Sequence, residues 1–122
     1  MITARILKRE HLGNMVHARL LAKPKALYWT FHARAKMRFS GFSEQRIRRV
    51  IHSPRRVEEG IAPKTIALMQ SGGSVKHPYE IWTMIQEEKS RRKVISAWRY
   101  PGETKPGAAL REDILRQLRE AL

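Results

Sequence analysis

Apolar residues recur at helical spacing in two short stretches of the chain. In the first, Ala33 and Met37 stand four residues apart; in the second, Ile47 is followed by Val50 and Ile51. Residues three or four positions apart lie on one side of a helix, so each stretch predicts a short helix with one buried face. The positions between these apolar residues are polar and mostly basic.

The sequence also indicates where these two helices begin and end. Thr30 and Ser43 carry hydroxyls that can accept a bond from a free backbone N–H at a helix start. Gly41 fits the left-handed backbone conformation just past a helix end, and Pro54 stops the second helix. We therefore expect one helix from residue 31 to about 39 and another from 44 up to Pro54.

Further along the chain the pattern changes to the alternation of β-strands. Strands are expected over residues 55–59, 65–70, 79–86 and 93–100, joined by a flexible connection at 71–74 and a turn at 87–90. The first is short and predicted to be an edge strand. In the third, Ile81 and Ile85 alternate with Trp82 and Met84. The last strand, which contains Val94, Ile95 and Trp98, is expected to be central and covered on both faces.

Both ends of the chain have helical patterns. Apolar residues within 2–22 predict one or two helices, packed or loosely ordered. Leu110, Ile114 and Leu118 predict an amphipathic helix over 108–121. Helices followed by strands indicate an α+β fold: two helices packed on a curved three- to four-stranded antiparallel sheet, with a C-terminal helix. We expect an N-terminal extension at 1–24, a main domain at 25–103 and the C-terminal helix within 104–122.

Composition limits the classes of function. The 122 residues suffice for one domain. Cysteine is absent and the five histidines lack metal-ligand spacing, so no disulfide, metal or other cofactor is predicted. No membrane span or signal peptide is recognisable, which favours a cytoplasmic protein. The net charge is +14, and a small domain this basic is typical of nucleic-acid partners.

The positive charge lies in separate blocks. Residues 24–60 carry nine basic and three acidic residues, and residues 91–105 carry five and one, whereas 61–90 and 106–122 are balanced. If the first helices and the last strand lie side by side, the blocks form one basic face. Otherwise they remain separate solvated surfaces.

Four short motifs, in this order, resemble a known group of bacterial proteins. They are HARAKM at 32–37, GFSE at 41–44, SPRRVE at 53–58 and RKVISAWR at 92–99. Together they resemble a family of short proteins in the RelE-like toxin superfamily, and the last motif is similar to the final strand of BrnT-type toxins. The resemblance covers roughly residues 28–101. It departs at Trp98, where BrnT-type proteins have an arginine, so that Arg99 is displaced by one residue.

The resemblance implies a compact RelE-like fold and a toxin-type function. In toxin members of the superfamily, a basic concave sheet face holds mRNA, often on the ribosome, and cleaves it. A cognate antitoxin wraps around the toxin and blocks that face. The implied partners are therefore RNA and an antitoxin protein, and the implied activity is that of a metal-independent endoribonuclease.

Cleavage of RNA without a metal needs a base, an acid and cations that stabilise the charged phosphate. His32 could serve as base or acid, because histidine titrates near neutrality. Tyr100 could donate a proton or stack on a base. The candidate phosphate-stabilising cations are Arg92, Lys93 and Arg99. The alternative is structural: His32 would bond to a backbone carbonyl or a neighbouring strand.

Other basic residues suit phosphate binding without chemistry. The candidates are Arg34, Lys36, Arg38, Arg48, Arg49, Arg55 and Arg56. They support a second hypothesis, a non-catalytic nucleic-acid-binding module on the same scaffold. A third hypothesis, a helix-turn-helix whose Arg46, Arg48 and Arg49 read a major groove, is disfavoured because strands rather than a third helix follow.

Overall fold

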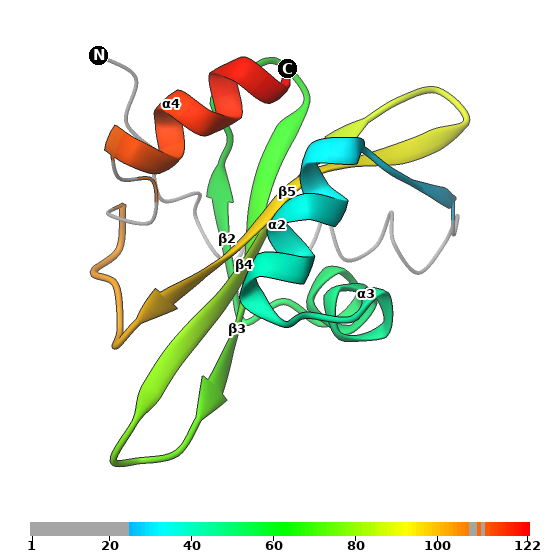
Figure 1. Ribbon diagram of the computed structural model, residues 1–122. Helices are drawn as coiled ribbons and strands as arrows, with labels where there is room; N and C mark the ends of the chain where they lie inside the picture. Colours follow the sequence, from blue (N-terminus) through cyan, green and yellow to red (C-terminus); the bar gives the residue numbers. More distant parts are fainter. Residues whose placement is uncertain (1–24, 108–109, 111) are drawn as a thin grey trace.

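The computed structural model describes residues 25–107, 110 and 112–122, and Figure 1 shows how they fold. The elements in chain order are β1 (Ala26–Trp29), α2 (Phe31–Ser40), α3 (Glu44–His52), β2 (Arg56–Glu59), β3 (Thr65–Gly73), β4 (Pro78–Glu87), β5 (Arg91–Pro101) and α4 (Glu112–Ala121). The expected α+β class is confirmed. The helices expected within 2–22 lie outside the described residues. No described helix is long and apolar enough to cross a membrane.

The sheet differs from the expected antiparallel one. It has five strands in the order β1-β5-β4-β3-β2, and β1 runs parallel to β5 while the other neighbours are antiparallel. The expectation of three or four antiparallel strands was therefore wrong. The extra strand arises because β1 pairs with residues distant in the chain, with Trp29 opposite Val94. Thr30 then leads directly into α2, and its backbone N–H donates to the Val94 carbonyl at 3.2 Å.

The connection expected at 71–74 is also corrected. Ser71, Gly72 and Gly73 continue β3, and Gly72 pairs with Tyr79 of β4. The Tyr79 ring lies against the backbone at Gly72, where an added Cβ would approach a ring carbon to 2.4 Å. The glycines therefore admit the ring and extend the hairpin. The expectation of an edge strand is confirmed for β2, and the last strand, β5, is an interior strand between β1 and β4.

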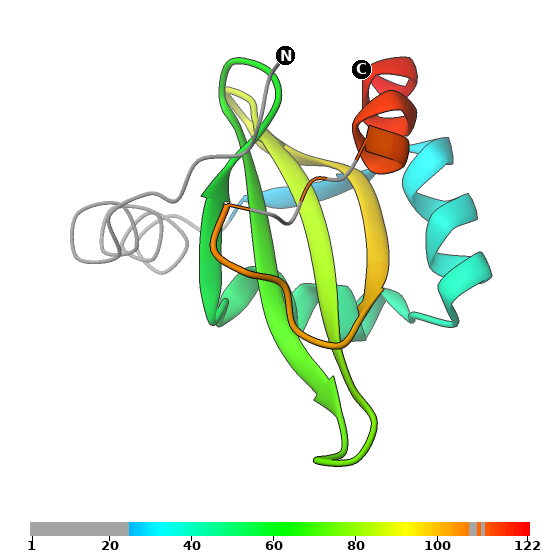
Figure 2. The ribbon, with the colours of Figure 1, turned by 90° about the vertical axis from the view of Figure 1, so that its left-hand side faces the viewer.

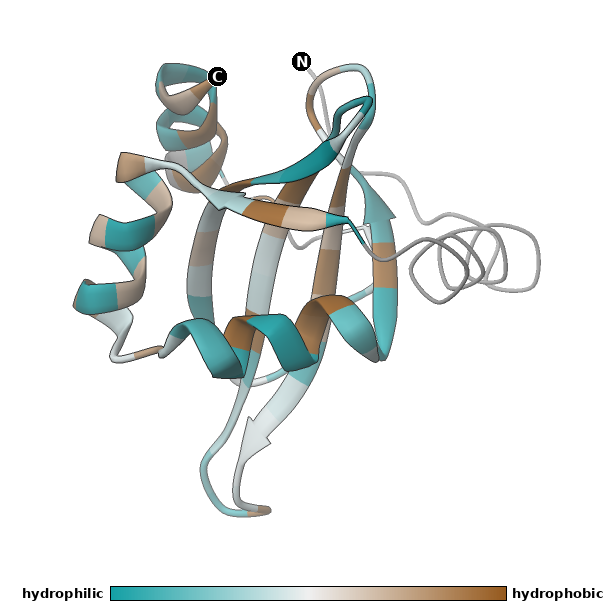
Figure 3. Ribbon diagram, turned by 90° about the vertical axis from the view of Figure 1, so that its right-hand side faces the viewer, coloured by the Kyte–Doolittle hydropathy of each residue, from teal (hydrophilic) through white to brown (hydrophobic). Residues whose placement is uncertain are grey.

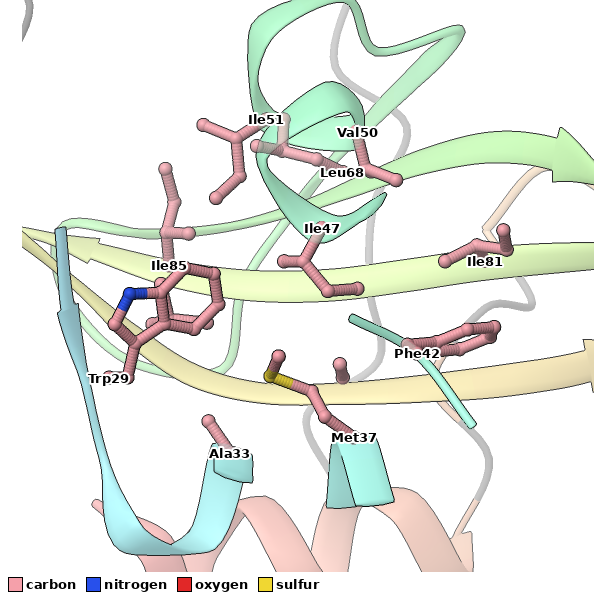
Figure 4. Close-up of a cluster of buried hydrophobic side chains, with 12 residues drawn as sticks. Trp29, Ala33, Met37, Phe42, Ile47, Val50, Ile51, Leu68, Ile81 and Ile85 are labelled. Atoms are coloured by element: carbon pink, nitrogen blue, oxygen red, sulfur yellow. The ribbon is translucent and has the colours of Figure 1, made fainter. Parts of the chain in front are cut away.

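One hydrophobic core lies between the sheet and the helices α2 and α3 (Figure 4). Ala33 and Met37 contribute from α2, and Ile47, Val50 and Ile51 contribute from α3, as the sequence predicts. Figure 3 shows the consequence for α3, whose hydrophobic side turns to the strands and whose hydrophilic side turns outward.

The predicted limits of these helices are confirmed by their caps. The Thr30 and Ser43 hydroxyls accept bonds from the backbone N–H groups of Ala33 and Arg46, each at 3.0 Å. Gly41 has φ of 74°, in the left-handed region.

A second core covers the opposite face of the sheet. The buried residues are Ala67, Met69, Trp82, Met84, Ile95, Trp98, Leu110, Leu115 and Leu118. Trp82 and Trp98 stack with ring centroids 6.0 Å apart. Figure 2 shows that the segment after β5 crosses this face, with α3 behind the strands. We call the two sides the α2–α3 face and the α4 face.

A bulge in β5 decides which side chains reach which face. Ile85 pairs with Val94 and Met84 pairs with Ser96, so Ile95 is an extra residue in β5. Val94 and Ala97 then both join the core of the α2–α3 face, although they are three residues apart. The shift also places Arg99 on the α2–α3 face, opposite Ile81.

Candidate nucleic-acid interface

The outer sides of α2 and α3, two helices that follow each other in the chain, are rich in basic residues. Residues 31–52 contain six lysines and arginines and a single acidic residue, Glu44. We define the α2–α3 surface by Arg34, Lys36, Arg38, Arg48 and Arg49. The two helices position these side chains because their apolar residues face the sheet, which leaves the basic residues outward.

Few of these cations are neutralised. Arg34 forms an ion pair with Glu44 at 2.6 Å, and both side chains are partly exposed. Arg38, Arg48 and Arg49 are exposed and have no carboxylate partner among the described residues. Such cations can exchange their counterions for phosphates of a nucleic acid.

Two exposed phenylalanines accompany the charge. Phe31 and Phe39, on the first and last turns of α2, are 84% and 87% exposed. The Lys36 ammonium lies 5.5 Å from the centre of the Phe39 ring. Exposed aromatic rings beside cations are the arrangement on which unpaired bases stack while phosphates bind the cations.

A cavity of about 350 Å³ lies at the junction of β1, α3 and β5. It is lined by Lys25, Leu27, Gln45, Arg48, Arg49, Ile51, His52 and Arg92. The structure therefore brings together three residues that the sequence analysis assigned to different roles: Arg48 and Arg49 from the binding set, and Arg92 from the catalytic set.

Arg92 is the most buried of the predicted catalytic cations. It is 2% exposed, and its Nε forms an ion pair with Glu87, the last residue of β4. The Glu87 carboxylate also accepts a bond from Lys25 at 2.7 Å. Arg92 thus serves a structural role near the start of β5, and a ligand could reach it through the cavity that it lines.

His32 occupies the first turn of α2, and its Nε2 atom lies 3.1 Å from the Ser96 hydroxyl of β5. Partial burial lowers the pKa of His32 below its ordinary value of 6.5, Lys36 lowers it further, and Glu120 of α4 raises it. The imidazole is therefore neutral at neutral pH. The contact is of the kind expected for a structural histidine that bonds to a neighbouring strand.

The remaining predicted catalytic residues lie elsewhere. Lys93 is near Glu88, with Nζ and Oε2 3.7 Å apart. Arg99 donates to the Ser40 carbonyl at 3.0 Å and stacks on the Tyr79 ring, 4.3 Å from its centre. Tyr100 is half-buried against the core of the α4 face.

The five catalytic candidates therefore do not form one cluster. Arg92 and Arg99 are seven residues apart along β5, roughly 20 Å for an extended strand. His32 and Ser40 stand at opposite ends of α2, so the Arg99 guanidinium lies about 12 Å from the first turn of the helix.

Arg55 and Arg56 differ sharply in environment. Arg55 is exposed and donates to the Ser71 hydroxyl. Arg56 instead lies on the α4 face of the sheet. There it forms ion pairs with the buried carboxylates of Glu58 and Glu80, and it donates a hydrogen bond to the Thr104 hydroxyl at 2.8 Å. Its role is structural, because it compensates two charges that are 1% and 3% exposed.

The helix-turn-helix hypothesis loses support from the position of Arg46. Its guanidinium donates to the Gln70 side chain of β3 at 2.6 Å. One of the three arginines assigned to groove reading therefore bonds to the sheet. The buried side of α3 packs on the strands rather than on a third helix.

Three residues that line the cavity and can donate hydrogen bonds were not among the predicted site residues: Lys25, Gln45 and His52. Lys25 precedes β1, a strand that was not expected, so nothing indicated that it would approach α3. A period-two pattern in Ala26–Trp29, with Leu27 and Trp29 alternating with more exposed neighbours, was the available signal.

No group of three or more histidine or acidic side chains among the described residues could hold a metal ion. Comparisons with family models, with curated proteins and with solved structures find no match for this chain.

Proposed function

We propose that this protein binds RNA, and that the α2–α3 surface is its contact with the phosphate backbone. The observation that carries the proposal is the set of exposed arginines without carboxylate partners among the described residues, Arg38, Arg48 and Arg49, on two consecutive helices. Single-stranded RNA is favoured over duplex because Phe31 and Phe39 offer exposed rings on α2, and Phe39 lies beside Lys36.

The opposite face supports this choice by contrast. The α4 helix, Glu112–Ala121, contains three acidic and two basic residues. Its apolar residues Leu115 and Leu118 lie against the second core. The α4 face therefore offers less attraction to a polyanion than the α2–α3 surface does.

The RelE-like, toxin-type assignment is part of this proposal. It rests on the motifs at 32–37, 41–44, 53–58 and 92–99, and the α+β arrangement with two helices before the sheet is consistent with it. On this assignment the protein acts in the cytoplasm, its RNA is mRNA, with or without the ribosome, and an antitoxin protein is its second partner. Expression that arrests growth, with relief by the product of a neighbouring small gene, would support the assignment.

Metal-independent RNA cleavage is a second candidate. The neutral imidazole of His32 favours it, because a base must be unprotonated to accept a proton from a 2′-hydroxyl. Lys36, which electrostatically lowers the pKa of His32, would supply a nearby cation. Incubation of stoichiometric protein with ribosomes and mRNA tests it. Intact mRNA and undiminished translation would remove this candidate and leave binding alone.

Binding itself is tested by titrating labelled single-stranded RNA with the full chain over a range of salt concentrations. The proposal expects the logarithm of the affinity to fall linearly with the logarithm of the salt concentration, by about 0.7 for each phosphate contacted. Negligible binding of RNA at low salt would refute the proposed function.

A further inference from the structure

The cavity at the junction of β1, α3 and β5 has the charge of an anion site. Lys25, Arg48, Arg49 and Arg92 line it, and Glu87 is the carboxylate that pairs with two of them. Four positive charges and one negative charge leave a net charge of +3. Arg48 and Arg49 have no carboxylate partner among the described residues, so no internal acid competes for them.

Arg92 lines this cavity with a side chain that the protein engages only in part. Glu87 occupies its Nε, and no other described residue bonds its two terminal nitrogens. Arg92 is 2% exposed and lines the cavity, so we expect a ligand to reach its terminal nitrogens from the cavity. Two parallel N–H donors match two oxygens of one phosphate.

The cavity also has an apolar wall and a suitable size. Leu27 and Ile51 lie beside the cations, and Gln45 and His52 add neutral polar groups. A volume of about 350 Å³ is at the lower end of small-molecule sites. A single nucleotide combines the same features, with one anionic group and one less polar sugar and base.

We propose that this cavity binds the terminal phosphomonoester of a nucleotide, either a free mononucleotide or the phosphorylated end of an RNA. A terminal phosphate carries more charge than an internal phosphodiester and protrudes from its chain. It can therefore enter past Arg48 and Arg49 to reach Arg92, whereas an internal phosphate is flanked by sugars on both sides. Binding of a phosphorylated RNA end rests on the proposed function, whereas binding of a free mononucleotide does not.

The first experiment compares four ligands by calorimetric titration of the full chain: AMP, adenosine, inorganic phosphate and pyrophosphate. AMP is expected to bind at least about tenfold more tightly than adenosine, because hydrogen bonds between charged groups are lost without the phosphate. Equal affinity for AMP and adenosine would overturn the proposed binding of a free mononucleotide. Equal binding of phosphate and AMP would reduce the site to one for the free anion and overturn the nucleotide assignment.

The second experiment uses one RNA sequence with a 5′-phosphate, a 3′-phosphate or two hydroxyl ends. The wild-type chain is expected to prefer one phosphorylated end, and Arg49→Gln and Arg48→Gln are expected to abolish that preference. Arg38→Gln is the matched control, because Arg38 belongs to the α2–α3 surface but does not line the cavity. This substitution should weaken the binding of all three RNAs by the same factor, so that the ratios of their affinities stay unchanged.

The outcomes separate the two proposals. If no RNA binds at low salt but AMP does, the proposed function fails and the cavity assignment stands. If all three RNAs bind equally, RNA binding stands and recognition of a chain end is refuted. A preference that survives in both cavity variants would place the phosphate elsewhere and overturn the inference. Far-ultraviolet circular dichroism on each variant confirms that its fold is retained.

Discussion

The imidazole of His32 contacts the hydroxyl of Ser96 across the boundary between α2 and β5, with Nε2 and Oγ 3.1 Å apart. Ser96 is 2% exposed and follows Ile95, the extra residue of the β5 bulge. The contact therefore ties the first turn of α2 to the one irregular point of the central strand. His32 also gives the fold a dependence on pH, because partial burial lowers its pKa.

Stability should decrease in mild acid because of His32. Its pKa in the folded chain lies below the ordinary 6.5, chiefly through burial, so the unfolded chain binds the proton more readily. The contribution is fully present above about pH 6.5 and is lost as the pH falls through the folded value. Urea unfolding of wild type and His32→Gln from pH 8 to 5 should show a smaller acid-side loss in the variant. Identical pH profiles would contradict this assignment.

Arg56 should be among the most important cations for stability. It is the cation that pairs with two buried carboxylates, Glu58 and Glu80, and its guanidinium lies 5.2 Å from the centre of the Trp82 ring. Removing one partner of a buried ion pair leaves uncompensated charge, which costs about 3–5 kcal/mol. Arg56→Met is therefore expected to reduce the free energy of unfolding by that order, measured by urea denaturation.

The neighbouring Arg55 provides the control for Arg56. It is exposed and bonds to a surface serine. Arg55→Met is expected to change the free energy of unfolding by less than about 0.5 kcal/mol. Equal destabilisation by the two substitutions would show that charge compensation under the α4 face is not what makes Arg56 important.

The exposed rings of α2 should matter for unpaired bases. Phe31→Ala and Phe39→Ala are each expected to weaken binding of single-stranded RNA by about 1–3 kcal/mol if the ring stacks on a base. The affinity for duplex RNA, whose bases are already stacked on one another, should decrease much less. Val75→Ala is the control, because Val75 is 99% exposed in the β3–β4 hairpin. Equal losses for single strands and duplexes would argue against stacking.

Local features of this fold could be predicted from the sequence. The caps at Thr30 and Ser43, the turn at Gly41 and the buried sides of α2 and α3 all depend on residues within a few positions of one another. The alternation in Tyr79–Gln86 placed its side chains on the correct faces for the same reason. Short-range backbone chemistry and periodicity are enough for such features.

Features set by distant residues could not be predicted. The parallel pairing of β1 with β5 joins residues more than 60 positions apart, and it brings Lys25 to Glu87. Arginine is a residue type that binds phosphate, so Arg92 was a reasonable candidate. Its ion-pair partner Glu87 was predicted to be part of a turn, so the pairing was not foreseen. The bulge at Ile95 changes the face of Arg99 without any glycine or proline to mark it.

The structure consequently agrees better with the predicted phosphate-binding residues than with the predicted catalytic residues. Of the residues chosen for phosphate binding on α2 and α3, the arginines are exposed and Lys36 is partly exposed, because helical periodicity predicts which side faces outward. The catalytic set depended on convergence of His32, Arg92 and Arg99, which is a property of tertiary structure. Each of these three has a structural partner in the fold: Ser96, Glu87 and the Ser40 carbonyl.

On the proposed function, RNA contacts the α2–α3 surface and not the α4 face. The direct test compares the salt dependence of RNA binding for Arg48→Gln/Arg49→Gln with that for Arg116→Gln/Arg119→Gln, which removes two exposed arginines of α4. The first variant is expected to bind more weakly, with a salt slope shallower by about 1.4, and the second to match the wild type. The reverse result, a shallower slope only in the α4 variant, would contradict the account.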